Sequence, residues 1–175
     1  MTRLIFYSLL AVVFTFLIHE FTHWLTGEFL GYEMTMTLNT VFPKAMKYDQ
    51  DWHYTLISAV GPLVTLLQAI IFYYLIKKYS NRDLYPFLFT TFYLMLLSGV
   101  LGYRNPNDLG RVSLYFNLGL FTLPAIAVII HFALLYKTSK RENYERKFNL
   151  LTLLLIILFS SIWILTNQKF KVVLL

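Results

Sequence analysis

Five long apolar runs, separated by short polar stretches, set the pattern of this 175-residue chain. They cover about residues 4–25, 54–76, 84–103, 112–136 and 148–166. A helix of about 20 apolar residues crosses the roughly 30 Å hydrocarbon core of a bilayer. The pattern therefore predicts an all-α polytopic membrane protein with about five transmembrane helices, forming a single integral membrane domain over residues 1–175.

A different period appears between the first two runs. Apolar and polar residues alternate from Tyr32 to Asn39, directly after Gly31, a residue typical of helix ends. This is the period of a short β-strand with one polar face, and a strand cannot face lipid with its backbone unpaired. We expect it to pair locally or to line a wet cavity, where its edge could bind an extended peptide. The alternative is an amphipathic surface loop, and residues 42–53 are expected to form a polar loop.

The composition agrees with a membrane protein and excludes several other classes. The chain is 58% hydrophobic and 14% charged, whereas soluble domains are about half apolar and a quarter charged. The net charge of +6 lies in short loops, which fits anionic lipid headgroups and not nucleic acid. Cysteine is absent, which excludes disulfides and thiolate chemistry. The first run is too long for a cleaved signal peptide, so we expect a multi-pass protein of the cell membrane that retains it.

The first run contains the motif His19-Glu20-Phe21-Thr22-His23. On a helix, residues i and i+4 lie on one face, so His19 and His23 can bind one metal ion. Two imidazoles and a carboxylate suit zinc, and Glu20 lies close enough to take a proton from a water beside the metal. The alternative is that these polar side chains merely line a helix bundle, although ionisable groups at membrane depth are usually functional.

A third ligand is predicted at Asp108. His19 follows Arg3 by about sixteen residues, a helical rise of roughly 24 Å, which places the histidines inside the membrane toward its far face. The third run returns the chain to that face, where Asp108 follows within the polar segment 104–111. The alternative is a plain turn, since Asn, Pro, Asp and Gly all favour turns. The other candidates on this face are Glu28, Glu33, Asp49, Asp51 and His53, of which His53 is expected to be an interfacial residue.

The remaining features are interpreted as structural. Gly61 and Pro62 in the second run predict freed backbone groups and the close approach of another helix. Pro124 predicts a kink in the fourth run, and His131 is expected near the end of that run, far from the histidine motif. A charged loop is expected over residues 137–147.

Together these motifs resemble the site-2 protease family of intramembrane zinc metalloproteases. The resemblance covers about residues 12–115 and implies a metalloprotease core over about residues 4–115, with additional helices at about 112–136 and 148–166. This chain has Asp-Leu-Gly where the family has Leu-Asp-Gly, and Thr22 replaces a common glycine. The matching segments are His19-Glu20-x-x-His23, Gly27, Leu30-Gly31-Tyr32, the strand-like stretch after it, Ala59-Val60-Gly61-Pro62-Leu63 and Asn105-Pro106-Asn107-Asp108-Leu109-Gly110.

The resemblance implies a zinc metalloendopeptidase that hydrolyses peptide bonds of membrane-embedded or membrane-proximal segments. It makes His19, His23 and Asp108 zinc ligands and Glu20 the catalytic general base. The implied partners are a membrane protein or peptide substrate and the lipid bilayer, with no nucleic acid. Two alternatives stay open: a non-proteolytic zinc-binding membrane scaffold or relic, and a metal transporter. The intact Glu20 favours chemistry, because a pure binding site needs no base there.

Two arguments about the orientation in the membrane disagree. The side on which the chain begins, side A, carries nine Lys and Arg residues, and the far side, side B, carries six. The positive-inside rule therefore places side A in the cytoplasm, whereas the resemblance places the site, and with it side B, near the cytoplasm. These residues are 3, 77, 78, 82, 137, 140, 141, 146 and 147 on side A, and 44, 47, 104, 111, 169 and 171 on side B.

Overall fold

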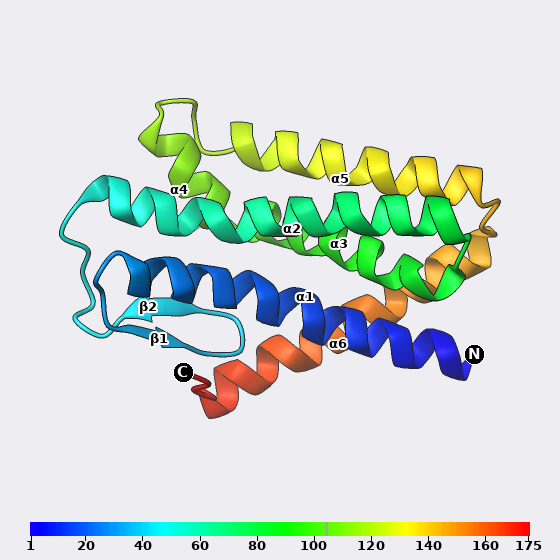
Figure 1. Ribbon diagram of the computed structural model, residues 1–175, viewed down its shortest axis with the longest axis horizontal. Helices are drawn as coiled ribbons and strands as arrows, with labels where there is room; N and C mark the ends of the chain where they lie inside the picture. Colours follow the sequence, from blue (N-terminus) through cyan, green and yellow to red (C-terminus); the bar gives the residue numbers. More distant parts are fainter. Residues whose placement is uncertain (104) are drawn as a thin grey trace.

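The computed structural model describes residues 1–103 and 105–175 and is mostly helical (Figure 1). Arg104, one of the cations assigned above to side B, lies outside the described residues. In chain order the elements are α1 (Thr2–Phe29), β1 (Met34–Met36), β2 (Val41–Pro43), α2 (Asp51–Tyr79), the short 3-10 helix η1 (Arg82–Leu84), α3 (Tyr85–Leu101), α4 (Asp108–Tyr115), α5 (Thr122–Arg141) and α6 (Arg146–Phe170).

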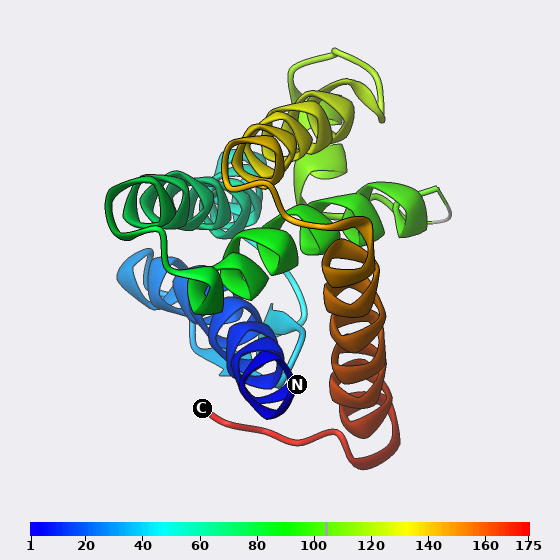
Figure 2. The same cartoon turned by 90° about the vertical axis from the view of Figure 1, so that its right-hand side faces the viewer.

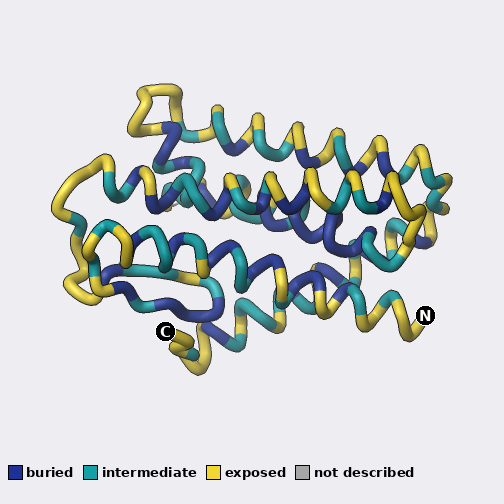
Figure 3. Tube along the Cα trace, in the orientation of Figure 1, coloured by how far each residue is buried: buried dark blue, intermediate teal, exposed yellow. Residues whose placement is uncertain are grey.

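Among the described residues, five helical segments are long and apolar enough to cross a membrane: α1, α2, α3 with η1, α5 and α6. This confirms the predicted fold class. Figure 3 shows that exposed residues follow the outer sides of these helices. Many of the exposed side chains are large and apolar, such as Leu63, Ile129 and Leu165. Such a surface suits lipid and not water, so the helices indicate a multi-pass membrane protein.

The prediction of a single helix over residues 112–136 was wrong. Two helices, α4 and α5, cover this part of the chain and are separated by residues 116–121. Asn117 and Gly119 in this connection have φ angles of 56° and 85°, the left-handed conformation that ends helices. Pro124 lies in the first turn of α5, where a missing N–H costs no helical hydrogen bond, and not at a kink. Because α5 continues to Arg141, the predicted loop 137–147 shrinks to residues 142–145.

The strand-like stretch pairs locally, which is one of the two outcomes predicted for it. β1 and β2 form an antiparallel hairpin in which Thr35 lies opposite Phe42 and Met36 opposite Val41. Residues 41–43 therefore belong to a strand, and the predicted polar loop is shorter than residues 42–53. The other edge of β1 is also paired, because the Met36 N–H donates to the Leu175 carbonyl at 3.0 Å.

α3 occupies the centre of the bundle, and its contacts extend to α1, α2, α5 and α6 (Figure 2). Leu88 of α3 is completely buried, and Val12 of α1 and Ile156 of α6 join the same apolar core. The hydroxyls of the buried Thr90 and Thr91 donate to carbonyls of their own helix at 2.8 Å, so they need no partner on a neighbour. This core fixes α1 and α2 relative to each other.

The hairpin and α4 lie at one end of the bundle, and the N-terminus lies at the other (Figure 1). This agrees with the predicted alternation of helix direction, in which α1 and α3 both run from side A to side B. The histidines near the end of α1 and the start of α4 therefore occupy the same end of the molecule.

The arrangement of five spans predicts which loops share a side of the membrane. Because the chain has no cysteine, single cysteines can be introduced at exposed positions without background. Tyr79→Cys and Glu145→Cys should react with a membrane-impermeant maleimide from one side, and Ala45→Cys and Leu118→Cys only from the other. Labelling of Glu145→Cys and Leu118→Cys from the same side would contradict the arrangement. The side of the membrane from which the maleimide reaches each cysteine also establishes the orientation of the protein.

Candidate metal centre

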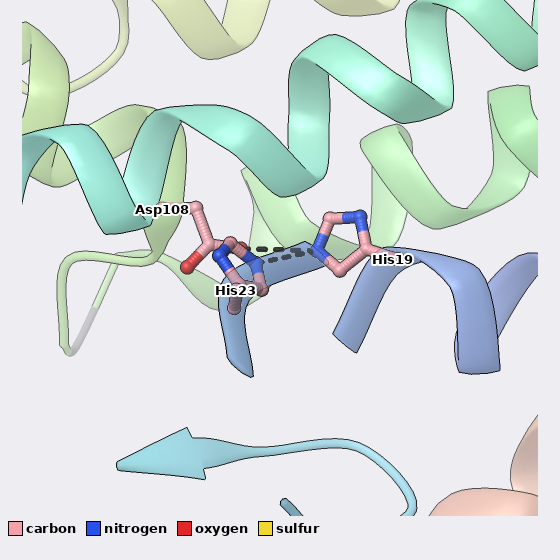
Figure 4. Close-up of side chains that lie close together, drawn as sticks. All are labelled: His19, His23 and Asp108. Atoms are coloured by element: carbon pink, nitrogen blue, oxygen red, sulfur yellow. Dashed lines mark hydrogen bonds and ion pairs between the residues drawn. The ribbon is translucent and has the colours of Figure 1, made fainter. Parts of the chain in front are cut away.

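Three metal-ligating side chains meet where α1, α2 and the start of α4 come together (Figure 4). His19 and His23 are 5% exposed, and Asp108 is half-buried. The two Nε2 atoms are 3.1 Å apart, and Oδ2 of Asp108 lies 3.2 Å from Nε2 of His19 and 3.4 Å from Nε2 of His23. The structure thus brings together the three residues that the sequence predicts as ligands.

Local sequence explains how Asp108 reaches the histidines. Asn107 is the N-cap of α4: its side-chain oxygen accepts the Gly110 N–H at 3.1 Å, the usual role of Asn at this position. Its amide also donates to the Ser98 carbonyl near the end of α3. The cap therefore fixes the first residue of α4, Asp108, relative to α3. The plain turn given above as the alternative is thus the start of a helix.

The outer nitrogens of both imidazoles have partners that define their protons. His23 Nδ1 lies 2.5 Å from the carbonyl of Ile57, which can only accept, so Nδ1 carries the hydrogen. His19 Nδ1 lies 2.8 Å from Oγ1 of Thr65, whose own hydroxyl donates to the Gly61 carbonyl at 2.9 Å. The Thr65 oxygen therefore accepts from His19. When the rings are neutral, each Nε2 is left with a lone pair that faces the other ring and the Asp108 carboxylate.

Three electron-pair donors at this separation repel one another unless a metal ion or a proton lies between them. Ligand atoms of a tetrahedral metal ion bound at about 2.0–2.1 Å lie about 3.3 Å apart, which matches the three distances between the side chains. Imidazoles that donate their outer N–H to a carbonyl or hydroxyl are also the usual form of metal-ligating histidine. The buried group of His19, His23 and Asp108 could therefore hold a metal ion.

Gly61 of α2 provides the space for the two imidazoles. A Cβ atom at this position would lie 2.6 Å from Cε1 of His23, in contact with its Nε2, and 2.9 Å from Cε1 of His19. These are distances that no side chain can adopt without moving the rings. The close approach predicted from Gly61 and Pro62 is thus an approach of α2 to the histidines of α1.

A pocket of about 220 Å³ opens beside His23 and Asp108. Glu20 and Asp108 line it from the helices, and Asn39, Thr40 and Val41 line it from the hairpin. Glu20 is 8% exposed, and no described residue donates a hydrogen bond to its carboxylate. A peptide or other ligand in this pocket would contact the hairpin and the ligating group together.

Tyr48 and Arg111 complete the polar wall of this pocket. Burial raises the pKa of Tyr48 to about 12, so its phenol remains a hydrogen-bond donor at neutral pH. Nη1 of Arg111 lies 3.4 Å from Oδ1 of Asp108, and its Nε donates to the Pro106 carbonyl at 3.0 Å. Arg111 therefore orients the carboxylate from the side away from the imidazoles.

The other sequence candidates lie outside the ligating group. Glu28 accepts the Met34 N–H at 2.8 Å, and His53 contacts the hydroxyl of Tyr32 at 2.6 Å through Nδ1, consistent with a structural role. Among the described residues, the group also excludes Glu33, Asp49 and Asp51.

His131 was placed too close to the end of its helix. It lies near the middle of α5, because that helix continues ten residues further, to Arg141. It is buried, and its Nδ1 contacts the Ala127 carbonyl one turn earlier at 2.7 Å. His131 is not part of the ligating group.

Sequence reasoning missed the residues that orient the ligands. Thr65 follows Gly61 by one helical turn, so its hydroxyl lies on the face of α2 that meets α1. A lone threonine four residues after a glycine in an apolar run was the available signal. The contact of His23 with the Ile57 carbonyl had no signal, because it depends on how α1 packs on α2. Arg111 follows Asp108 by three residues, a spacing that brings the two side chains together only because this segment is the start of α4.

Replacing Gly61 tests whether the packing of α2 determines metal binding. Gly61→Ala should abolish stoichiometric metal binding, measured by elemental analysis of the purified protein, because the methyl group displaces both imidazoles. Gly99→Ala is the matched control, since its Cβ would lie 3.7 Å from Pro124, an ordinary contact. Equal metal content in the two variants would contradict this role of Gly61.

No protein-family model, curated protein or solved structure matches this chain. Conclusions about the protein therefore rest on its own residues. Those that the structure describes form five apolar helical segments, which indicate a multi-pass membrane protein, and a buried His-His-Asp group that could hold a metal ion.

Proposed function

We propose that this protein is an intramembrane zinc metalloprotease that cleaves membrane-embedded or membrane-proximal segments of other proteins. The observation that carries the proposal is that the buried Glu20 lines one pocket together with His23 and Asp108, two members of the His19, His23 and Asp108 group. The resemblance of the sequence motifs to the site-2 protease family supports the same function.

Zinc is the proposed metal because of the donor set. Catalytic zinc sites commonly use three protein ligands, nitrogens and a carboxylate oxygen, and leave one position open. His19, His23 and Asp108 supply three such donors, and His23 and Asp108 line a pocket. When bound, zinc supplies Lewis-acid chemistry: it polarises a carbonyl and lowers the pKa of water at the site.

Glu20 is the proposed general base. Its carboxylate lines the pocket without belonging to the ligating group, so it is free to accept a proton. It would take a proton from the water that attacks the scissile carbonyl, and then donate that proton to the leaving amine as the carbon–nitrogen bond breaks. Arg111 would keep Asp108 in position, and the protonated Tyr48 would offer a hydrogen bond to a peptide carbonyl.

The hairpin supports a peptide substrate in extended form. Thr37 and Lys44 donate backbone N–H groups to the Thr40 and Glu33 carbonyls, so hydrogen bonds alternate along the hairpin. This alternation turns the N–H and C=O of Val41 away from β1, and Val41 lines the pocket. An unwound substrate segment could pair with this edge by strand addition, which would present its carbonyls to the metal centre.

Two rival functions use the same metal group. A non-proteolytic scaffold or relic would bind zinc and a partner without cleavage, and the Asp-Leu-Gly order is the feature that favours it. A metal transporter would release the ion to the opposite side. Neither rival requires a carboxylate that faces the pocket without contacting the metal, which is the reason for preferring the protease.

Removing the proposed third ligand should weaken zinc binding strongly. Asp108→Ala is expected to lower zinc affinity by more than the roughly 10–100-fold effect of losing a residue that only orients a ligand. Asp51→Ala is the control, because Asp51 is exposed and outside the ligating group. Isothermal titration of the metal-free proteins measures both, and similar affinities for the two variants would exclude Asp108 as a ligand.

Replacing Glu20 separates the protease from its rivals. Glu20→Gln keeps the size of the side chain and removes the base, so zinc should stay bound while cleavage falls at least about a hundredfold. Glu33→Gln makes the same change on an exposed side chain and should leave both unchanged. The assay is cleavage of a panel of single-span membrane proteins in liposomes, with a zinc chelator added to one arm.

The panel distinguishes the three functions. Cleavage by the wild type that survives Glu20→Gln would contradict the proposed mechanism. If the wild type binds zinc and cleaves no member of the panel, the scaffold function replaces the protease. Zinc flux into sealed liposomes would instead favour the transporter.

A further inference from the structure

Two side chains of α6 hold the turn of the hairpin. The Asn167 side chain accepts the Leu38 N–H at 3.3 Å and donates to Oγ1 of Thr37 at 3.1 Å and to the side-chain oxygen of Asn39. One turn earlier on α6, the indole N–H of Trp163 donates to the Leu38 carbonyl at 2.8 Å. Both backbone groups of Leu38 are therefore satisfied by α6, much as a neighbouring strand would satisfy them.

These contacts have a defined donor and acceptor arrangement. Because the Leu38 N–H can only donate, the amide oxygen of Asn167 must face it, and the amide nitrogen is left to donate to Thr37 and Asn39. Asn167 is only 8% exposed. In the described part of the chain, every hydrogen bond from residues 37–40 to another element goes to α6 or to the segment after it.

The same turn forms a wall of the metal pocket, which Asn39 and Thr40 line. The base of the hairpin is attached elsewhere, to the helix that carries the histidines: Met34 packs on Gly27 and donates its N–H to Glu28 at 2.8 Å. The hairpin is therefore held at its base by α1 and at its turn by α6. His19, His23 and Asp108 make none of these contacts, since their partners lie on α2 and α4, so losing the contacts of the turn to α6 would release the pocket wall without removing a contact of these three residues.

We propose that Asn167 and Trp163 are positioning residues that latch the hairpin turn against the metal pocket, so that α6 controls access to the site. The latch requires only the contacts described here, and the identity of a peptide as the molecule admitted rests on the proposed function. Release of the latch opens the pocket wall, and its closure holds the Val41 edge where an extended segment can pair with it.

Amide hydrogen exchange of the full-length, zinc-loaded protein in lipid nanodiscs tests the latch directly. Asn167→Ala should accelerate exchange of the amides at residues 36–41 at least about tenfold, because it removes hydrogen bonds to the turn. Trp163→Phe keeps an aromatic ring against Phe16, loses only the N–H donor, and should give a smaller change in the same segment. Ser160→Ala is the control, since Ser160 is buried on α6 and its hydroxyl bonds to no described residue.

The expected pattern is faster exchange in the hairpin, unchanged exchange in α1 and α2, and unchanged zinc content. Unchanged hairpin exchange in both Asn167→Ala and Trp163→Phe would overturn the latch. Loss of zinc, or faster exchange throughout α1, would also overturn it, because Asn167 would then support the whole bundle. Neither readout requires proteolysis, so absence of cleavage by the wild type would count against the proposed function alone.

Discussion

The approach of α2 to α1 at Gly61 is the contact on which the candidate site depends. Any side chain at this position would occupy the space of the two imidazoles, since even a Cβ atom would lie 2.6 Å from Cε1 of His23 and 2.9 Å from Cε1 of His19. The apolar core that α3 organises keeps the two helices at this distance. Because the rings fill the space that Gly61 leaves, their Nε2 atoms are directed toward Asp108 and not into the lipid.

Polar side chains at membrane depth must satisfy one another, because lipid offers them no partner. Around the site, each ligating side chain has a second polar partner. Thr65 and the Ile57 carbonyl take the outer N–H groups of the imidazoles, and Arg111 takes one oxygen of Asp108. What is left is a set of lone pairs directed at one point, which a cation satisfies. The same arrangement that permits burial thus favours a metal ion.

The sequence predicted the helices, the strand and the clustering of His19, His23 and Asp108, because each depends on a local period or on the parity of membrane crossings. It failed where local signals compete: Asn117 and Gly119 split a run that looked continuous, and Pro124 begins a helix where a kink was expected. It could not predict that Asn167 holds the hairpin turn. Asn167 and Thr37 of the turn are 130 positions apart in the sequence, and only the packing of α6 brings them together.

The central claim is that one metal ion is bound by two imidazoles and a carboxylate. X-ray absorption spectroscopy of the purified, zinc-loaded protein tests it most directly, combined with the metal content per chain. The account predicts one zinc per chain and a first shell with two imidazole nitrogens at about 2.0–2.1 Å, completed by oxygen. A protein that retains no zinc after purification and reloading, or a shell with fewer than two imidazoles, would contradict it.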